Sequence, residues 1–109
     1  MRSKEYYVYI LTDENKKAFY IAMTIGLPQR LIEHYTRRED LKTFTGKHQC
    51  LSLVFYEKHK NAPGAMERVK KIKSFDRAQK EELIETFNPT WASLNAELVG
   101  QWPPEEIEG

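Results

Sequence analysis

The sequence predicts one α+β domain whose elements follow the order β-β-α-β-α-α. Three observations lead to this prediction. Three short segments are rich in β-branched and aromatic residues, as strands are, and other segments repeat their apolar residues at helical spacing. The length of 109 residues suits a single domain, and a composition that is 40% hydrophobic and 30% charged excludes collagen-like, low-complexity and wholly disordered chains.

Two strand-like segments open the chain, at residues 6–11 and 19–23. The short polar stretch between them favours an antiparallel hairpin. Because side chains alternate across a strand, the second segment turns three apolar residues toward the expected core, namely Phe19, Ile21 and Met23. The tyrosines then share the other face, in the set Tyr7, Tyr9, Leu11, Tyr20 and Ala22.

A first helix is predicted to open near Gly26, with Pro28 in its first turn, where proline is well tolerated. An apolar repeat of four residues marks its core face, at Leu27, Leu31 and Tyr35. Residues 38–49 are charged and irregular, and residues 51–56 form the third strand-like segment.

Two more helices are predicted in the second half of the chain. One begins near Pro63 and carries an apolar stripe made of Met66, Val69 and Ile72. The other is capped by Asp76, has Gln79 in the capping-box position and runs to Phe87.

The net charge of +1 hides an uneven distribution. Residues 96–109 contain four glutamates and no Lys or Arg, so residues 1–95 carry 17 basic against 12 acidic residues, a charge of +5. We therefore expect a folded domain over residues 1–95 and an acidic, proline-containing tail over 96–109. A charge of +5 is compatible with a polyanionic partner and equally with an ordinary solvated surface.

The single cysteine, Cys50, excludes an internal disulfide and suits a reducing compartment, so we expect a cytoplasmic protein. We interpret Cys50 as a small hydrophobic residue at the start of a strand rather than a nucleophile, and His48 and His59 as surface residues. The longest uncharged apolar run, near residues 50–56, is too short to span a membrane, and no membrane partner is expected.

Six residues form the most informative set for chemistry: Tyr7, Tyr9, Tyr20, Arg30, His34 and Asn88. Tyrosines on adjacent strands can point at one place, and a helix that begins just after the second strand can add an arginine and a histidine there. Arginine pairs with phosphate oxygens, and tyrosine or histidine can orient or deprotonate a water. Such a site suits a phosphodiester, although strand tyrosines and a solvated helix face would give the same pattern.

These residues resemble the motifs of the GIY-YIG nuclease domain, in particular its small stand-alone members. Tyr7-Val8-Tyr9 and Tyr20-Ile21-Ala22 correspond to the two half-motifs, and Arg30 lies ten residues after Tyr20. His34 completes the Arg-x-x-x-His step. Later blocks also match, at residues 44–47, 53–57 and 88–94, so the resemblance covers roughly residues 5–95.

The resemblance implies a three-stranded antiparallel sheet flanked by helices and cleavage of nucleic acid, with DNA expected, that depends on Mg²⁺ or Mn²⁺. By position, the catalytic roles pass to Tyr9, Tyr20, Arg30, His34 and Asn88. A nucleic-acid-binding surface is expected from Tyr7 and the basic residues Arg37, Lys47, Arg68, Lys70, Lys71 and Lys73.

Two departures from the family pattern shape the expected function. Val69 occupies the position of the metal-binding glutamate, and valine cannot bind a hard cation, which requires oxygen ligands. Ala22 replaces the glycine of the second half-motif. We therefore expect a nucleic-acid-binding protein of nuclease descent whose hydrolysis is weak or lost. The alternatives are an active metal-dependent DNA endonuclease in repair or recombination, and a protein-interaction module on a degenerate nuclease fold.

Overall fold

A computed structural model describes residues 5–104. Three strands form one antiparallel sheet in the order β2-β1-β3: β1 (Tyr6–Thr12), β2 (Phe19–Thr24) and β3 (Ser52–His59). Five helices surround it: α1 (Leu27–Thr36), α2 (Phe44–His48), α3 (Ala62–Ser74), α4 (Arg77–Phe87) and α5 (Asn95–Val99). The predicted α+β class and the three-stranded antiparallel sheet are confirmed. Within residues 5–104 no helix has the length and apolar character that crossing a membrane requires.

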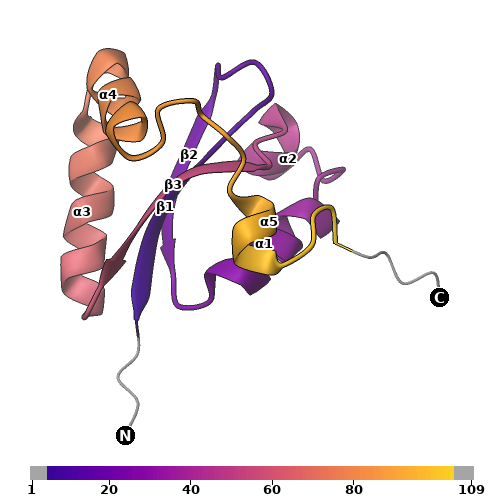
Figure 1. The fold of residues 1–109 in the computed structure, drawn as a ribbon, viewed down its shortest axis with the longest axis horizontal. Coiled ribbons are helices and arrows are strands. Elements are labelled where there is room, and N and C mark those ends of the chain that lie inside the picture. The colour runs from indigo at the N-terminus through magenta and orange to yellow at the C-terminus, as the bar shows by residue number, and fades with distance from the viewer. Residues whose placement is uncertain (1–4, 105–109) are drawn as a thin grey trace, which may run out of the picture.

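The sheet is packed on both faces. Helices α3 and α4 lie on one side of it, and α1, α2 and α5 lie on the other (Figure 1). Because β1 is the central strand, Val8, Tyr9, Ile10 and Leu11 are all fully buried.

Alternation along the strands divides the interior into two cores. The first core lies under α3 and α4 and contains Val8, Ile10, Ile21, Val54, Phe55, Ala65, Val69, Ile72 and Ile84. The second core contains Tyr9, Leu11, Leu27, Leu31, Cys50 and Leu53. Phe19, Ile21 and Met23 do face a core, as predicted. The tyrosine face, however, is a second core rather than an open surface, because α1 and α5 cover it.

The register of the hairpin sets the positions of the motif residues. Tyr9 pairs with Ala22 and Leu11 pairs with Tyr20 across β1 and β2. The side chains of Tyr9 and Tyr20 therefore lie diagonally on one face, with ring centroids 6.1 Å apart.

Residues 38–49 contain a helix that the sequence pattern did not indicate. Helix α2 has only five residues, too few to show an apolar period, and it ends at Gln49 in a left-handed conformation rather than at a glycine. The Thr43 hydroxyl caps it by accepting from the Gly46 N–H at 3.0 Å. Gly46 has no room for a side chain, because a Cβ there would lie 2.1 Å from the Asp40 carbonyl oxygen. Helix α2 is thus held tightly against the loop that follows α1.

The buried stripe of α3 differs from the predicted one at a single position. Met66 is 51% exposed, and Ala65 takes its place beside Val69 and Ile72. A small residue at position 65 lets the helix approach the sheet closely. The capping box of α4, formed by Asp76 and Gln79, is present as predicted.

Packing continues beyond residue 95. Leu98, Val99 and Trp102 lie against the second core, and α5 packs on α1. Asn95 is fully buried: its side chain accepts from the Leu53 N–H at 2.7 Å and donates to the Leu51 carbonyl at 2.7 Å. This asparagine therefore satisfies backbone groups at the start of β3, where a further strand would otherwise be needed. Glu105, Glu106 and Glu108 of the predicted acidic tail lie outside the described residues.

Replacing Asn95 by alanine should destabilise the protein by about 2–4 kcal/mol, because the buried N–H of Leu53 and the partly buried carbonyl of Leu51 lose their partners. Urea unfolding followed by circular dichroism measures the change. Asn15, exposed in the β1–β2 turn, supplies the matched control, Asn15→Ala. A loss below about 0.5 kcal/mol would show that water satisfies both backbone groups.

Candidate active site

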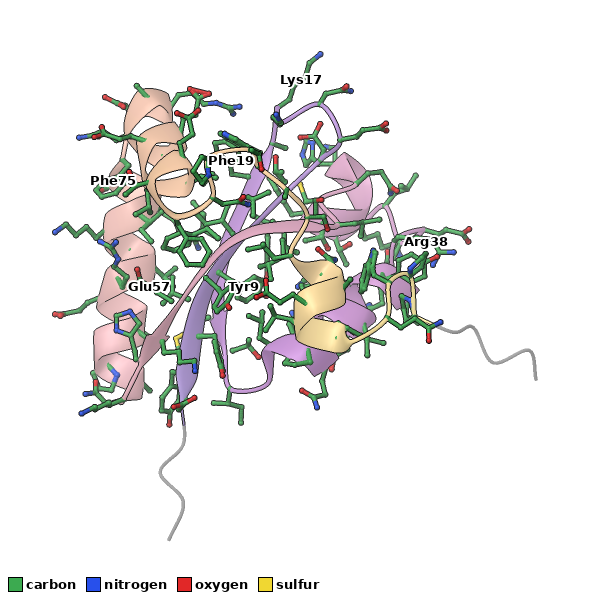
Figure 2. The ribbon with its side chains drawn as sticks, viewed as in Figure 1. Tyr9, Lys17, Phe19, Arg38, Glu57 and Phe75 are labelled. Carbon is green, nitrogen blue, oxygen red and sulfur yellow. The ribbon has the colours of Figure 1, made fainter. Side chains whose placement is uncertain are left out.

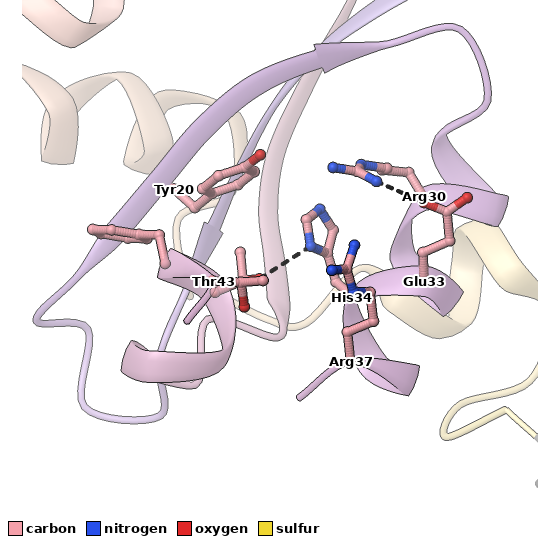
Figure 3. Close-up of a pocket in the computed structure, with 8 residues that line it drawn as sticks. Tyr20, Arg30, Glu33, His34, Arg37 and Thr43 are labelled. Carbon is pink, nitrogen blue, oxygen red and sulfur yellow. Dashed lines mark hydrogen bonds and ion pairs between the residues drawn. The ribbon is translucent and has the colours of Figure 1, made fainter. Parts of the chain in front are cut away.

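A cavity of about 160 Å³ lies between α1, β2 and α2. Its lining combines aromatic, basic and hydroxyl side chains, from Tyr20, Arg30, Glu33, His34, Arg37, Thr43, Phe44 and Thr45 (Figure 3). Helix α1 and its C-cap residue Arg37 contribute residues at i, i+3, i+4 and i+7, which share one side of a helix. The cavity therefore gathers Tyr20, Arg30, His34 and Arg37 of the predicted site residues in one place.

His34 is the centre of a buried hydrogen-bond chain. Its Nε2 lies 3.0 Å from the Tyr9 hydroxyl, and its Nδ1 lies 3.2 Å from the Thr45 hydroxyl. The Tyr20 ring meets the imidazole edge-on, with centroids 5.2 Å apart. Both ring nitrogens are engaged, so the orientation of the imidazole is set from β1 and from α2.

The electrostatic setting keeps His34 neutral. Burial lowers the pKa of His34 to about 4, and the positive charges of Arg30 and Arg37 act in the same direction. A neutral imidazole has one donor and one acceptor nitrogen, which matches its two hydroxyl partners. The three hydrogen-bonded side chains of Tyr9, His34 and Thr45 therefore carry no net charge at neutral pH.

Tyr9 lies behind His34 rather than on the cavity wall. Its side chain is fully buried, and burial and the neighbouring Tyr20 raise its pKa well above the usual range. The Tyr9 phenol is therefore protonated at neutral pH and positions His34. Tyr20, which is half-buried, is the motif tyrosine that lines the cavity.

The cavity is cationic. Arg30 and Arg37 have side chains that are 37% and 61% exposed. One Nη of Arg30 donates to Glu33 at 2.6 Å; although partial burial lowers the pKa of Arg30, this hydrogen bond raises it above the usual range. Glu33 is the one carboxylate among the lining residues. An anion would thus meet two guanidinium groups.

The donor set of the cavity does not suit a resident divalent cation. The Glu33 carboxylate is paired with Arg30, and both nitrogens of His34 are engaged. Across residues 5–104 no three His, Cys, Asp or Glu side chains come close enough together to hold a metal ion. Val69, which the resemblance assigns to the metal-ligand position, is 9% exposed and packs in the first core, on the opposite side of β1 from Tyr9.

Ala22 and Cys50 fill space in the second core. The Ala22 methyl lies opposite Tyr9 in the register and is not part of the cavity lining. Burial raises the pKa of Cys50 to about 11, so its thiol is protonated and unreactive at neutral pH. Cys50 is a buried apolar residue, as the sequence suggested.

Asn88 is placed apart from the cavity. It is buried at the end of α4, where its amide donates to the Val54 carbonyl at 3.1 Å and to the Ala92 carbonyl at 2.8 Å. Its Oδ1 accepts from the Ala92 N–H at 3.2 Å. Asn88 therefore fastens the turn after α4 to the edge of β3.

The predicted nucleic-acid-binding residues are dispersed. Arg68 donates to Glu57 at 2.9 Å, and Glu57 lies beside α3, away from α1 (Figure 2). Tyr7 packs against Tyr56 and under Lys58. Exposed lysines lie on α2, at Lys47, and on α3, at Lys70, Lys71 and Lys73. Of these, Lys73 lines a groove that also contains Tyr20 and Lys80.

Sequence reasoning missed the contributions of Glu33, Thr43, Phe44 and Thr45 to the cavity. Thr45 belongs to the block at residues 44–47 that matched the family, and this match was the available signal. The contact between Thr45 and His34 depends on how the loop after α1 folds back, which no local pattern reveals.

The His34 pKa predicts how stability depends on pH. Unfolded histidine titrates near 6.5, whereas His34 in the folded protein titrates near 4, so below pH 6.5 only the unfolded chain takes up this proton. The contribution of neutral His34 to the free energy of unfolding should be fully present above pH 6.5 and should be lost as the pH decreases toward 4. His34→Gln should remove roughly 2 kcal/mol of that decline, since one pKa unit corresponds to about 1.4 kcal/mol and solvent screens part of the effect.

Urea unfolding at several pH values between 7 and 4 measures this difference, with His48→Gln as the control at an exposed histidine. Parallel curves for the wild type and His34→Gln would contradict the buried, neutral state of His34.

Comparison with known proteins agrees with the motifs and the fold. Residues 5–86 match the family model described as the GIY-YIG catalytic domain. Comparisons with curated proteins and with solved structures give no match. The matched region spans β1 to α4 and includes Tyr9, Tyr20, Arg30 and His34. With three quarters of its length covered by this one domain, and with the sheet and helices in the corresponding order, the chain belongs to the GIY-YIG family.

Proposed function

We propose that this protein binds nucleic acid, with DNA as the expected form, at the cavity between α1, β2 and α2, and that its hydrolysis of phosphodiesters is weak or lost. The observation that carries the proposal is a cationic cavity, lined by Arg30 and Arg37, in a nuclease domain whose metal-ligand position holds the buried Val69. The cationic lining favours binding of phosphate. The valine at position 69 removes the oxygen ligand for a metal ion that cleavage would use.

The two arginines are available to a phosphate. Each pairs with a carboxylate on its own segment, Arg30 with Glu33 and Arg37 with Asp40 at 3.5 Å. These pairs are partly or largely exposed, and such pairs contribute about 1 kcal/mol or less, so a phosphate can replace them. The planar guanidinium group suits two oxygens of one phosphate.

The site lacks more than one of the groups that hydrolysis needs. Arg30 could stabilise the charge that grows on the phosphate, and the Tyr20 hydroxyl lies in the cavity to orient a water. His34, however, is hydrogen-bonded through both nitrogens, to Tyr9 and to Thr45, so it has no free acceptor for a proton from water. With no carboxylate at position 69, both metal-assisted and direct activation of water are impaired.

Binding should depend on the cavity arginines. The double variant Arg30→Ala with Arg37→Ala should weaken binding of a short DNA duplex and reduce the slope of log K against log salt by about one to two units. Fluorescence anisotropy from 50 to 200 mM salt measures both quantities. The control Lys60→Ala removes an exposed charge beyond β3 and should leave affinity within about twofold. An unchanged slope in the double variant would contradict phosphate binding in the cavity.

Restoring the missing ligand tests the loss of hydrolysis. Val69 lies one helical turn before Lys73, on the same side of α3, and Lys73 shares a groove with Tyr20 at the edge strand β2. A glutamate at position 69 could therefore reach that edge, and glycine at position 22 would restore space beside Tyr20, on the other face of β2. Val69→Glu with Ala22→Gly should cut DNA in the presence of Mn²⁺, whereas the wild type should not, and adding Arg30→Ala should abolish the cutting.

The restored carboxylate has a cost. Val69 is an apolar core residue, so an unpaired charge there should lower the free energy of unfolding by several kcal/mol. Urea unfolding of the double variant without and with Mn²⁺ separates misfolding from inactivity. Metal-dependent cutting by the wild type would overturn the proposed loss, and a folded variant that binds Mn²⁺ without cutting would contradict the roles given to Tyr20 and Arg30.

A further inference from the structure

A second groove adjoins the cavity and shares a wall with it. The groove has a volume of about 340 Å³ and is lined by Phe19, Tyr20, Ile21, Phe44, Lys73 and Lys80. Tyr20 and Phe44 line both spaces, with ring centroids 6.1 Å apart and planes inclined by 32°. These two rings therefore form a ridge between the arginines on one side and the two lysines on the other.

Phe44 belongs to neither core and is 45% exposed. It is nevertheless held in place, because it is the first residue of α2, whose start is capped by Thr43. The His48 ring, one turn later, packs against it with centroids 4.4 Å apart. An exposed phenylalanine that is held by contacts with Tyr20 and His48 contributes a rigid apolar face to the surface rather than to the fold.

The surroundings of Phe44 suit one kind of ligand. Ammonium groups at Lys73 and Lys80 and guanidinium groups at Arg30 and Arg37 lie on opposite sides of the ridge, where successive phosphates of a strand would be neutralised. A flat aromatic face between such charges is the arrangement on which nucleobases stack. In a duplex both faces of a base are already stacked, so only an unpaired base can use this ring.

We propose that the ridge of Tyr20 and Phe44 is a stacking site for an unpaired nucleobase, and that this chain prefers single-stranded or locally opened nucleic acid to continuous duplex. The proposal rests on the proposed nucleic-acid binding and names its substrate class. The strand lies with one phosphate at Arg30 and Arg37, the base on Phe44, and the neighbouring phosphate at Lys73 and Lys80.

The test compares a labelled twelve-residue oligothymidylate with a twelve-base-pair duplex by fluorescence anisotropy. The measured quantity is the ratio of the two affinities, which does not depend on how much either is weakened overall. Phe44→Ala should lower the single-strand preference about tenfold, within the range for loss of one aromatic stacking contact. Phe44→Leu, which keeps an apolar side chain without a ring, should lose as much, and Phe44→Trp should keep the preference.

Phe87 provides the matched control, since it is also 45% exposed but packs on Phe55 and Tyr56 at the far edge of the sheet. Phe87→Ala should leave the ratio within twofold. Lys73→Ala with Lys80→Ala should weaken the single strand and reduce its salt slope. Urea unfolding confirms that each variant is folded, and a folded Phe44→Leu that keeps the full preference would overturn the stacking site.

The remaining outcomes separate this inference from the proposed function. Binding of both probes that depends on Arg30 but not on Phe44 would overturn the stacking site alone. Absence of binding to either probe would overturn both, and would leave the ridge as a surface for a protein partner.

Discussion

The hydrogen bond between the Tyr9 hydroxyl and His34 Nε2, 3.0 Å long, is the contact on which the site depends. Tyr9 belongs to the central strand and is covered by helices, so its hydroxyl needs a buried partner. His34 provides that partner from α1 and reaches Thr45 of α2 with its other nitrogen. One imidazole therefore joins the sheet to two helices. The same hydrogen bond to Tyr9 fixes the orientation of α1, whose residues form one wall of the cavity.

This arrangement has a chemical consequence. His34 is neutral and both of its nitrogens are hydrogen-bonded, and the side chain of Tyr9 has no exposed surface. The groups left facing the cavity are Tyr20 and the arginines. Such a set binds and orients a phosphate more readily than it activates water. The binding and the reduced hydrolysis that we propose therefore have a common physical origin, to which the apolar residue at position 69 adds.

The edge strand β2 is where the separate parts of the chain meet. Helix α3 packs against one face of it, helix α2 lies on the other side of the sheet, and α1 begins at Leu27, shortly after its end (Figure 1). Tyr20 on this strand thereby contacts both His34 and Phe44. Basic residues from α1, α3 and α4 converge on the two sides of that ring although they are up to fifty positions apart in the sequence.

Much of this protein can be predicted from its sequence because the signals are local. The strands follow from β-branched and aromatic segments, α4 from its capping box, and the membership of the family from Tyr9, Tyr20, Arg30 and His34 at their spacing. Alternation also places both tyrosines on one face. The tertiary structure decided what that face is: burial by α1 and α5 turned it into a second core and put Tyr9 behind His34. It likewise placed Asn88 at a turn and Phe44 beside Tyr20. These outcomes depend on how distant segments pack against one another, and packing across the fold leaves no trace in local spacing.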